Sequence, residues 1–103
     1  GVQVLQQAIT RVPDDAGLHH ALGLALVRTE KKKDAILSLA RAVQLAPESP
    51  RYALVHAVAL HDSSRQEEAI AALETALQIS PQDRDLKGAL LDYQERAKKA
   101  NND

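Results

Sequence analysis

The sequence predicts an all-α protein built from antiparallel helix-turn-helix units, and two observations favour this fold class. A proline recurs at one constant interval, at Pro13, Pro47 and Pro81, and each proline closes a similar phrase of apolar and small residues. Between the prolines, apolar residues recur at spacings of three and four, which is the period of an amphipathic helix. A fixed period of this length is typical of a chain that stacks one helical unit on the next.

Six helices are expected, at residues 3–12, 15–29, 32–45, 49–62, 66–79 and 83–99. The second, fourth and sixth helices each follow a proline-containing segment that supplies a capping oxygen or an early acid. Polar turns at 29–32 and 62–65 separate the helices of a pair. The last helix is polar, as expected of a terminal cap, and the tail 101–103 is expected to fray.

When successive units are aligned by the interval between the prolines, leucine, alanine and proline recur at the same positions of each unit. In this pattern the chain resembles the tetratricopeptide repeat, a helix-turn-helix unit with small residues where its two helices cross. The resemblance implies a right-handed α-solenoid and a single domain over 1–103, with a half repeat at 2–13, repeats at 16–49 and 50–83, and a half repeat or capping helix at 84–100. The matching repeat positions are Leu22, Gly23, Ala35, Leu39, Ala42, Pro47, Ala57, Ala69, Leu73, Ala76 and Pro81.

The chain also departs from the family pattern. His19 and Ala53 replace a bulky aromatic residue, His56 replaces a leucine, and Leu91 replaces a small residue. Since His56 stands at a packing position, we expect a partly buried, hydrogen-bonded histidine there.

The segments 50–60 and 83–86 are similar to repeats that trail bacterial exported multihaem cytochrome-like proteins. This second resemblance implies a bacterial parent and favours the periplasm, although the compartment is otherwise unknown. Val2, Leu5 and Ile9 lack the helix that covers them in the family, and Gly1 stands where an initiator methionine would. We therefore expect a fragment of a longer protein that forms a homodimer through its N-terminal helix.

Composition argues against several classes of function. The formal net charge is −1, no apolar run is long enough to span a membrane, and cysteine is absent. We expect no nucleic-acid partner, no membrane insertion, no thiolate catalysis and no zinc-thiolate site. The lysines of the turn 31–33 are flanked by acids and are interpreted as a solvated loop.

Catalysis and metal binding are not expected either. The adjacent pair His19 and His20 would point about 100° apart on a helix. The spacing of His56 and His61 is also not that of a helical metal pair. We expect a non-enzymatic chain without a cofactor.

The resemblance implies a protein–protein interaction module that holds a peptide or protein segment in a concave groove. The family's carboxylate clamp is absent, because the corresponding positions hold His20, Leu24, Val58, Asp85 and Ala89. The alternative function is a structural or self-associating scaffold that docks another domain of a larger protein. The groove positions projected from the family are His20, Leu24, Val27, Arg28, Arg51, Leu54, Val58, His61, Asp62 and Asp92.

Overall fold

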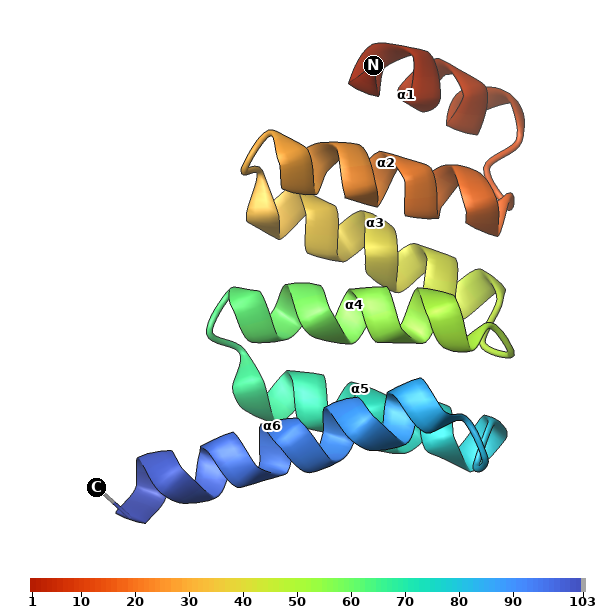
Figure 1. The fold of residues 1–103 in the computed structure, drawn as a ribbon. Helices are drawn as coiled ribbons and strands as arrows, with labels where there is room; N and C mark the ends of the chain where they lie inside the picture. Colours follow the sequence, from red (N-terminus) through yellow and green to blue (C-terminus); the bar gives the residue numbers. More distant parts are fainter. Residues whose placement is uncertain (103) are drawn as a thin grey trace.

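The computed structural model describes residues 1–102, which form six α-helices stacked along one axis (Figure 1). The stack measures 47 × 29 × 15 Å. The all-α helical-repeat fold expected from the sequence is confirmed, and so is the number of helices in this part of the chain. The helices are α1 (Val2–Arg11), α2 (Ala16–Arg28), α3 (Lys32–Leu45), α4 (Pro50–Asp62), α5 (Gln66–Ile79) and α6 (Arg84–Asn102).

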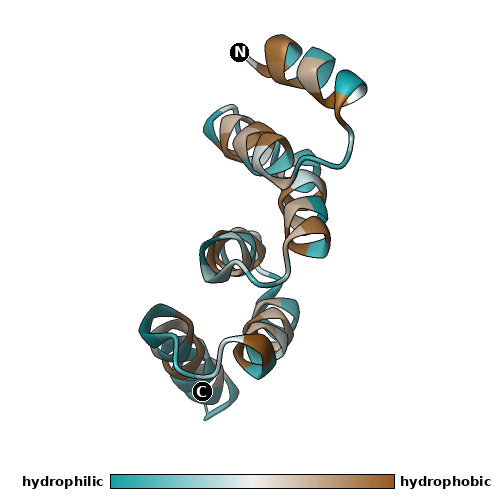
Figure 2. Cartoon of the chain, turned by 90° about the vertical axis from the view of Figure 1, so that its right-hand side faces the viewer, coloured by the Kyte–Doolittle hydropathy of each residue, from teal (hydrophilic) through white to brown (hydrophobic). Residues whose placement is uncertain are grey.

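The helices alternate between two layers (Figure 2). One layer contains α2, α4 and α6, and its outer side, which we call the front face, is toward the viewer in Figure 1. The other layer contains α1, α3 and α5, and its outer side is called the back face. Two layers of amphipathic helices bury their apolar stripes against each other and leave both faces available for binding.

The helices of the front layer begin at matched caps. The side chains of Asp15, Ser49 and Asp83 accept hydrogen bonds from the backbone N–H groups three residues later, at 3.0, 3.2 and 2.9 Å. Each bond satisfies a donor that a helix terminus otherwise leaves without a partner. The start signals predicted from the sequence are therefore confirmed.

The turns within each pair also match. Glu30 and Ser64, which stand at equivalent positions of the two repeats, both adopt the left-handed conformation, with φ of 60° and 63°. The backbone N–H of the following residue, Lys31 or Arg65, then donates to the carbonyl of Leu26 or Leu60 at 3.0 or 2.9 Å. Because the same backbone hydrogen bond closes both turns, the two helix pairs have the same local geometry.

Leucine, alanine and glycine fill the core where the helices cross. At Gly23 an added Cβ would lie 2.5 Å from Cδ2 of Leu39, so glycine is needed for the close approach of α2 and α3. Leu39 and Leu73 are fully buried at equivalent places in the two units. Among the repeat positions, Pro47 and Pro81 are exposed at the ends of the back-layer helices, and the others are buried. Small residues let the helices approach until the leucines contact both neighbours.

Two details differ from expectation at the ends of the described chain. Helix α6 extends to Asn102, so Asn101 and Asn102 are helical where fraying was expected, and Asp103 lies outside the described residues. The alanines and lysines before them are strong helix formers, and no glycine or proline ends the helix. At the other end, Val2, Leu5 and Ile9 pack against the cluster of Leu22, Leu26 and Ala35, although no residue of α1 is fully buried.

Candidate functional site

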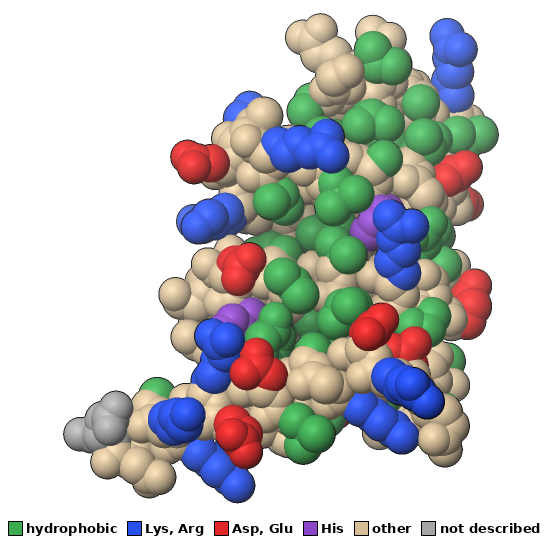
Figure 3. All heavy atoms as spheres, viewed as in Figure 1, with side chains coloured by type: hydrophobic (Ala, Val, Ile, Leu, Met, Phe, Trp, Pro, Cys, Tyr) green, Lys and Arg blue, Asp and Glu red, His purple; other side chains and the backbone are tan. Residues whose placement is uncertain are grey.

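The predicted groove residues are spread over the three front-layer helices. Hydrophobic side chains gather over α2 and α4, with charged side chains around them (Figure 3). Val27 and Val58 are 45% and 38% exposed, and Leu24 and Leu54 are half-buried. The front face thus carries an apolar centre that solvent can reach.

Two hollows lie at opposite ends of α4. The start hollow lies between the first turns of α4 and α6 and is lined by Pro50, Arg51, Leu54, Asp83 and Asp85. The turn hollow lies near the ends of α2 and α4. Leu24 and Val58 line neither the start hollow nor the turn hollow. The front face therefore carries separate depressions. The turn hollow is lined by Val27, Lys32, Ala35, Ala59, Asp62 and Ser63.

His20 differs from the groove position projected for it. Its side chain is only 6% exposed, and its ring stacks on Tyr52 of α4 with 4.5 Å between the ring centroids. Neither ring nitrogen has a hydrogen-bond partner among the described residues. Burial lowers the pKa of His20, and the nearby charge of Arg51 lowers it further. His20 thus joins α2 to α4 as a neutral ring, and its nitrogens are covered from a ligand on the front face.

A second histidine–tyrosine stack joins α4 to α6. The rings of His61 and Tyr93 lie 3.9 Å apart and are nearly parallel, at 9°. Burial raises the pKa of Tyr93, with further contributions from Asp62 and Asp92 that Arg96 opposes. Because Arg96 also pairs with Asp92 at 3.1 Å, part of the negative charge here is neutralised within α6. Asp62 forms no ion pair with a described residue, and Lys32 lines the same hollow.

The other predicted groove residues lie at the margins. Arg28 is exposed at the end of α2, and Arg51 is exposed at the start of α4. Half-buried His61 lines a hollow with Arg96 near the end of α6. The margins therefore carry both signs of charge, with arginines on α2 and α4 and acids on α4 and α6.

Several residues of this face were missed from the sequence. They include Lys32 and Ala59 of the turn hollow, Asp83 of the start hollow, and both tyrosines of the stacks. The sequence did contain one signal for the stacks: the two histidine–tyrosine pairs have the same spacing along the chain. The repeat period does not reveal that spacing, since it aligns equivalent positions and not contacts between them.

His56 lies away from the front face. It is half-buried beside α3 and α5, and its ring forms no hydrogen bond with any residue in 1–102, so the hydrogen bond expected from its packing position is not found. Burial lowers the pKa of His56, Arg65 lowers it further, and Glu68 opposes them. A half-buried ring can bond to solvent, which explains why no protein partner is required.

Across residues 1–102, no three histidine, aspartate or glutamate side chains are grouped so that they could hold a metal ion. Within the same residues, none of the helices has the length and apolar character needed to cross a bilayer.

Comparison with known structures supports the fold. The chain matches the Sgt2 TPR domain from Aspergillus fumigatus with a TM-score of 0.84 and 15% identity, covering 99% of this chain and 69% of that one. It matches the TPR2B domain of yeast Sti1, solved as a complex with pHsp70, with a TM-score of 0.77 and 19% identity over 92% and 81% of the two chains. For MamA AMB-1 the TM-score is 0.78 and the identity 23%, and the match covers 98% of this chain and 55% of MamA.

The comparison with curated proteins found no match. The family model of the tetratricopeptide repeat matches residues 1–50 and 20–84. These matches span most of the chain and include both matched turns and all three matched caps. The chain belongs to the tetratricopeptide repeat family.

Proposed function

We propose that the chain is a protein–protein interaction module that binds a peptide or protein segment across its front face. The observation that carries this proposal is the exposed apolar centre formed by Val27 and Val58 beside Leu24 and Leu54. Burial of such side chains against a partner's apolar stripe would supply most of the binding free energy. The yeast Sti1 domain, which shares the fold, was solved with a bound partner, and this supports the same use here.

Charged residues at the margins would orient the segment. Arg51 stands beside Asp83 and Asp85 in the start hollow, and Asp62 lies in the turn hollow about a helix length away. A segment with a basic residue near Asp62 and an apolar centre would complement this arrangement. Exposed charges contribute little affinity but select register and suppress wrong partners.

The test replaces one apolar residue of the centre with an acid. Val58→Asp should weaken binding by about 2 kcal/mol or more, roughly 30-fold, because the carboxylate must be desolvated when the segment binds. The helix should remain, since Val58 is 38% exposed and its replacement can be hydrated in the free protein. The measurement is the affinity of a partner first recovered with the wild-type chain and then purified for calorimetry.

Two control variants separate the front face from the rest. Leu37→Asp makes the same type of change at a residue that is 69% exposed on α3 of the back layer, and Lys31→Glu changes a charge in the turn before α3. Both should bind with nearly wild-type affinity. Equal affinity for the Val58 variant would remove the front face as the binding site and favour the scaffold function. A loss of helicity in that variant would show that Val58 belongs to the core.

A further inference from the structure

A pocket opens on the back face between α3 and α5, with α4 at its floor. Its walls include Val43 from α3 and Ala71, Thr75 and Ile79 from α5, and its floor includes Ala53 and His56 from α4. Most of these groups are apolar. Ile79 is 49% exposed at the rim, so the pocket is accessible from solvent.

The first repeat shows why this pocket exists. At the equivalent positions one period earlier, His19, Leu37 and Arg41 stand in place of Ala53, Ala71 and Thr75. The chain has the same helices there but larger side chains, so the second repeat lacks groups that the first one has. The pocket is a specific difference between two otherwise equivalent units.

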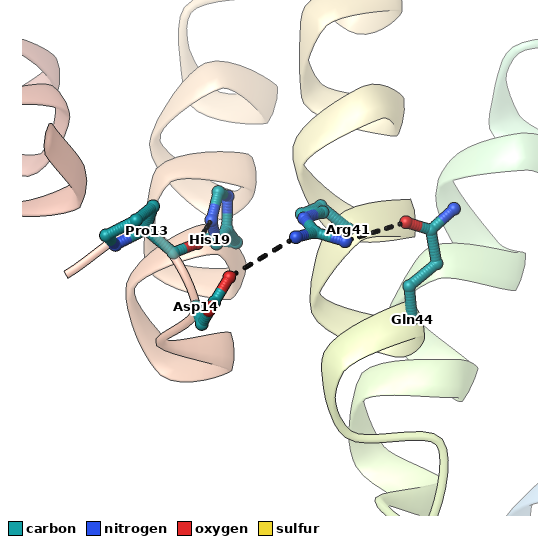
Figure 4. Close-up of polar contacts among 5 residues, drawn as sticks. All are labelled: Pro13, Asp14, His19, Arg41 and Gln44. Carbon is teal, nitrogen blue, oxygen red and sulfur yellow. Dashed lines mark hydrogen bonds and ion pairs between the residues drawn. The ribbon is translucent and has the colours of Figure 1, made fainter.

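In the first repeat, His19 and Arg41 make polar contacts in this region (Figure 4). Arg41 reaches from α3 to Asp14 in the loop before α2, at 3.5 Å, and also donates to Gln44 at 3.2 Å. The Nε2 atom of His19 is 2.7 Å from the carbonyl oxygen of Pro13. Alanine and threonine cannot make these contacts in the second repeat, so that region is left open.

The titratable group in the pocket floor is His56, which stands where the first repeat has Leu22. Its ring has no hydrogen-bond partner among the described residues. Burial keeps the pKa of His56 below its ordinary value, so the imidazole is neutral near neutral pH. A neutral imidazole has one N–H donor and one nitrogen acceptor, and either can bond to a hydroxyl.

We propose that this back pocket binds a phenol-class ring, the side chain of a tyrosine, with the ring against the apolar walls and the hydroxyl hydrogen-bonded to His56. An apolar ring can occupy the space that Ala71 and Thr75 leave open beside the apolar walls. The hydroxyl of the ligand lies against the imidazole of His56, whereas a charged group would lose its hydration against the apolar walls. The site is independent of the front face.

The test is an NMR titration of the chain with p-cresol, the side-chain analogue of tyrosine, and with toluene, which lacks the hydroxyl. Chemical-shift changes should centre on Ala71, Thr75 and His56. The affinity for p-cresol should exceed that for toluene by roughly 2- to 10-fold, the factor expected of one neutral hydrogen bond. Equal affinities, or shifts centred on the front face, would overturn the proposal.

Variants that carry the residues found at the equivalent positions of the first repeat provide matched controls. Ala71→Leu with Thr75→Arg should narrow the pocket and weaken binding of both compounds, and Thr75→Arg alone serves if the double variant does not fold. His56→Leu should bind both compounds equally well. Unchanged p-cresol binding by a folded fill-in variant would refute the location, and a retained preference for p-cresol in His56→Leu would refute the hydrogen bond. Val58→Asp should leave both titrations unchanged, which separates this site from the proposed function.

Discussion

Replacing His20 with leucine is expected to stabilise the protein, because the structure buries this imidazole without partners. Two buried nitrogens without hydrogen bonds cost about 1–3 kcal/mol. The stack on Tyr52 stabilises the folded state by about 0.5–1.5 kcal/mol, and the leucine variant would lose this contribution. The net gain should be about 1 kcal/mol, or roughly 4–8 °C in Tm for a domain of this size. A leucine already stands at the equivalent position of the next unit, Leu54.

The same substitution should reduce the sensitivity of the protein to acid. The pKa values of His20 and His56 lie below the ordinary 6.5 in the folded state, so the unfolded chain binds more protons as the pH falls through that value. Their contribution to stability is fully present above pH 6.5 and decreases as the pH drops from there toward the folded pKa values. Each histidine adds a slope of up to about 1.4 kcal/mol per pH unit, and His20→Leu removes one of the two.

Urea denaturation followed by far-UV circular dichroism, at about pH 8 and about pH 5.5, measures both effects. The wild type should lose more stability between these two pH values than His20→Leu, and the double variant with His56→Leu should lose least. A lower stability of His20→Leu at the higher pH would refute the reasoning and indicate that the ring holds a water molecule. An unchanged difference between the two pH values would show that His20 titrates normally when folded.

Three further predictions concern packing and assembly. His56→Leu should raise the free energy of unfolding by about 1 kcal/mol through apolar transfer, as a urea titration would show, and a decrease would indicate a hydrogen bond to solvent worth keeping. Gly23→Ala should lower it by about 1–3 kcal/mol, because the new Cβ overlaps Leu39; an equally stable variant would show that α2 and α3 separate at little cost. Light scattering should detect concentration-dependent association through α1, whereas a monomer at every concentration, with α1 protected from hydrogen exchange, would contradict the predicted homodimer.

Local periodicity made most of the fold predictable. The third and fifth helices have the predicted bounds, and every other boundary is within one residue except the end of α6. Helix ends are set by caps and turns a few residues long, so signals such as Asp15, Ser49 and Asp83 can be identified without knowing what packs nearby. The end of α6 was missed because no capping residue marks it.

The repeat period by itself determined the fold class, the helices and the family of this protein. It did so because backbone hydrogen bonds and amphipathic spacing act between residues three or four positions apart. Only the tertiary structure decided that His20 is covered by Tyr52, that hollows lie at both ends of α4, and that a pocket opens beside His56. These features depend on the sizes of side chains from different helices that are distant in the chain, which the spacing along one helix does not encode.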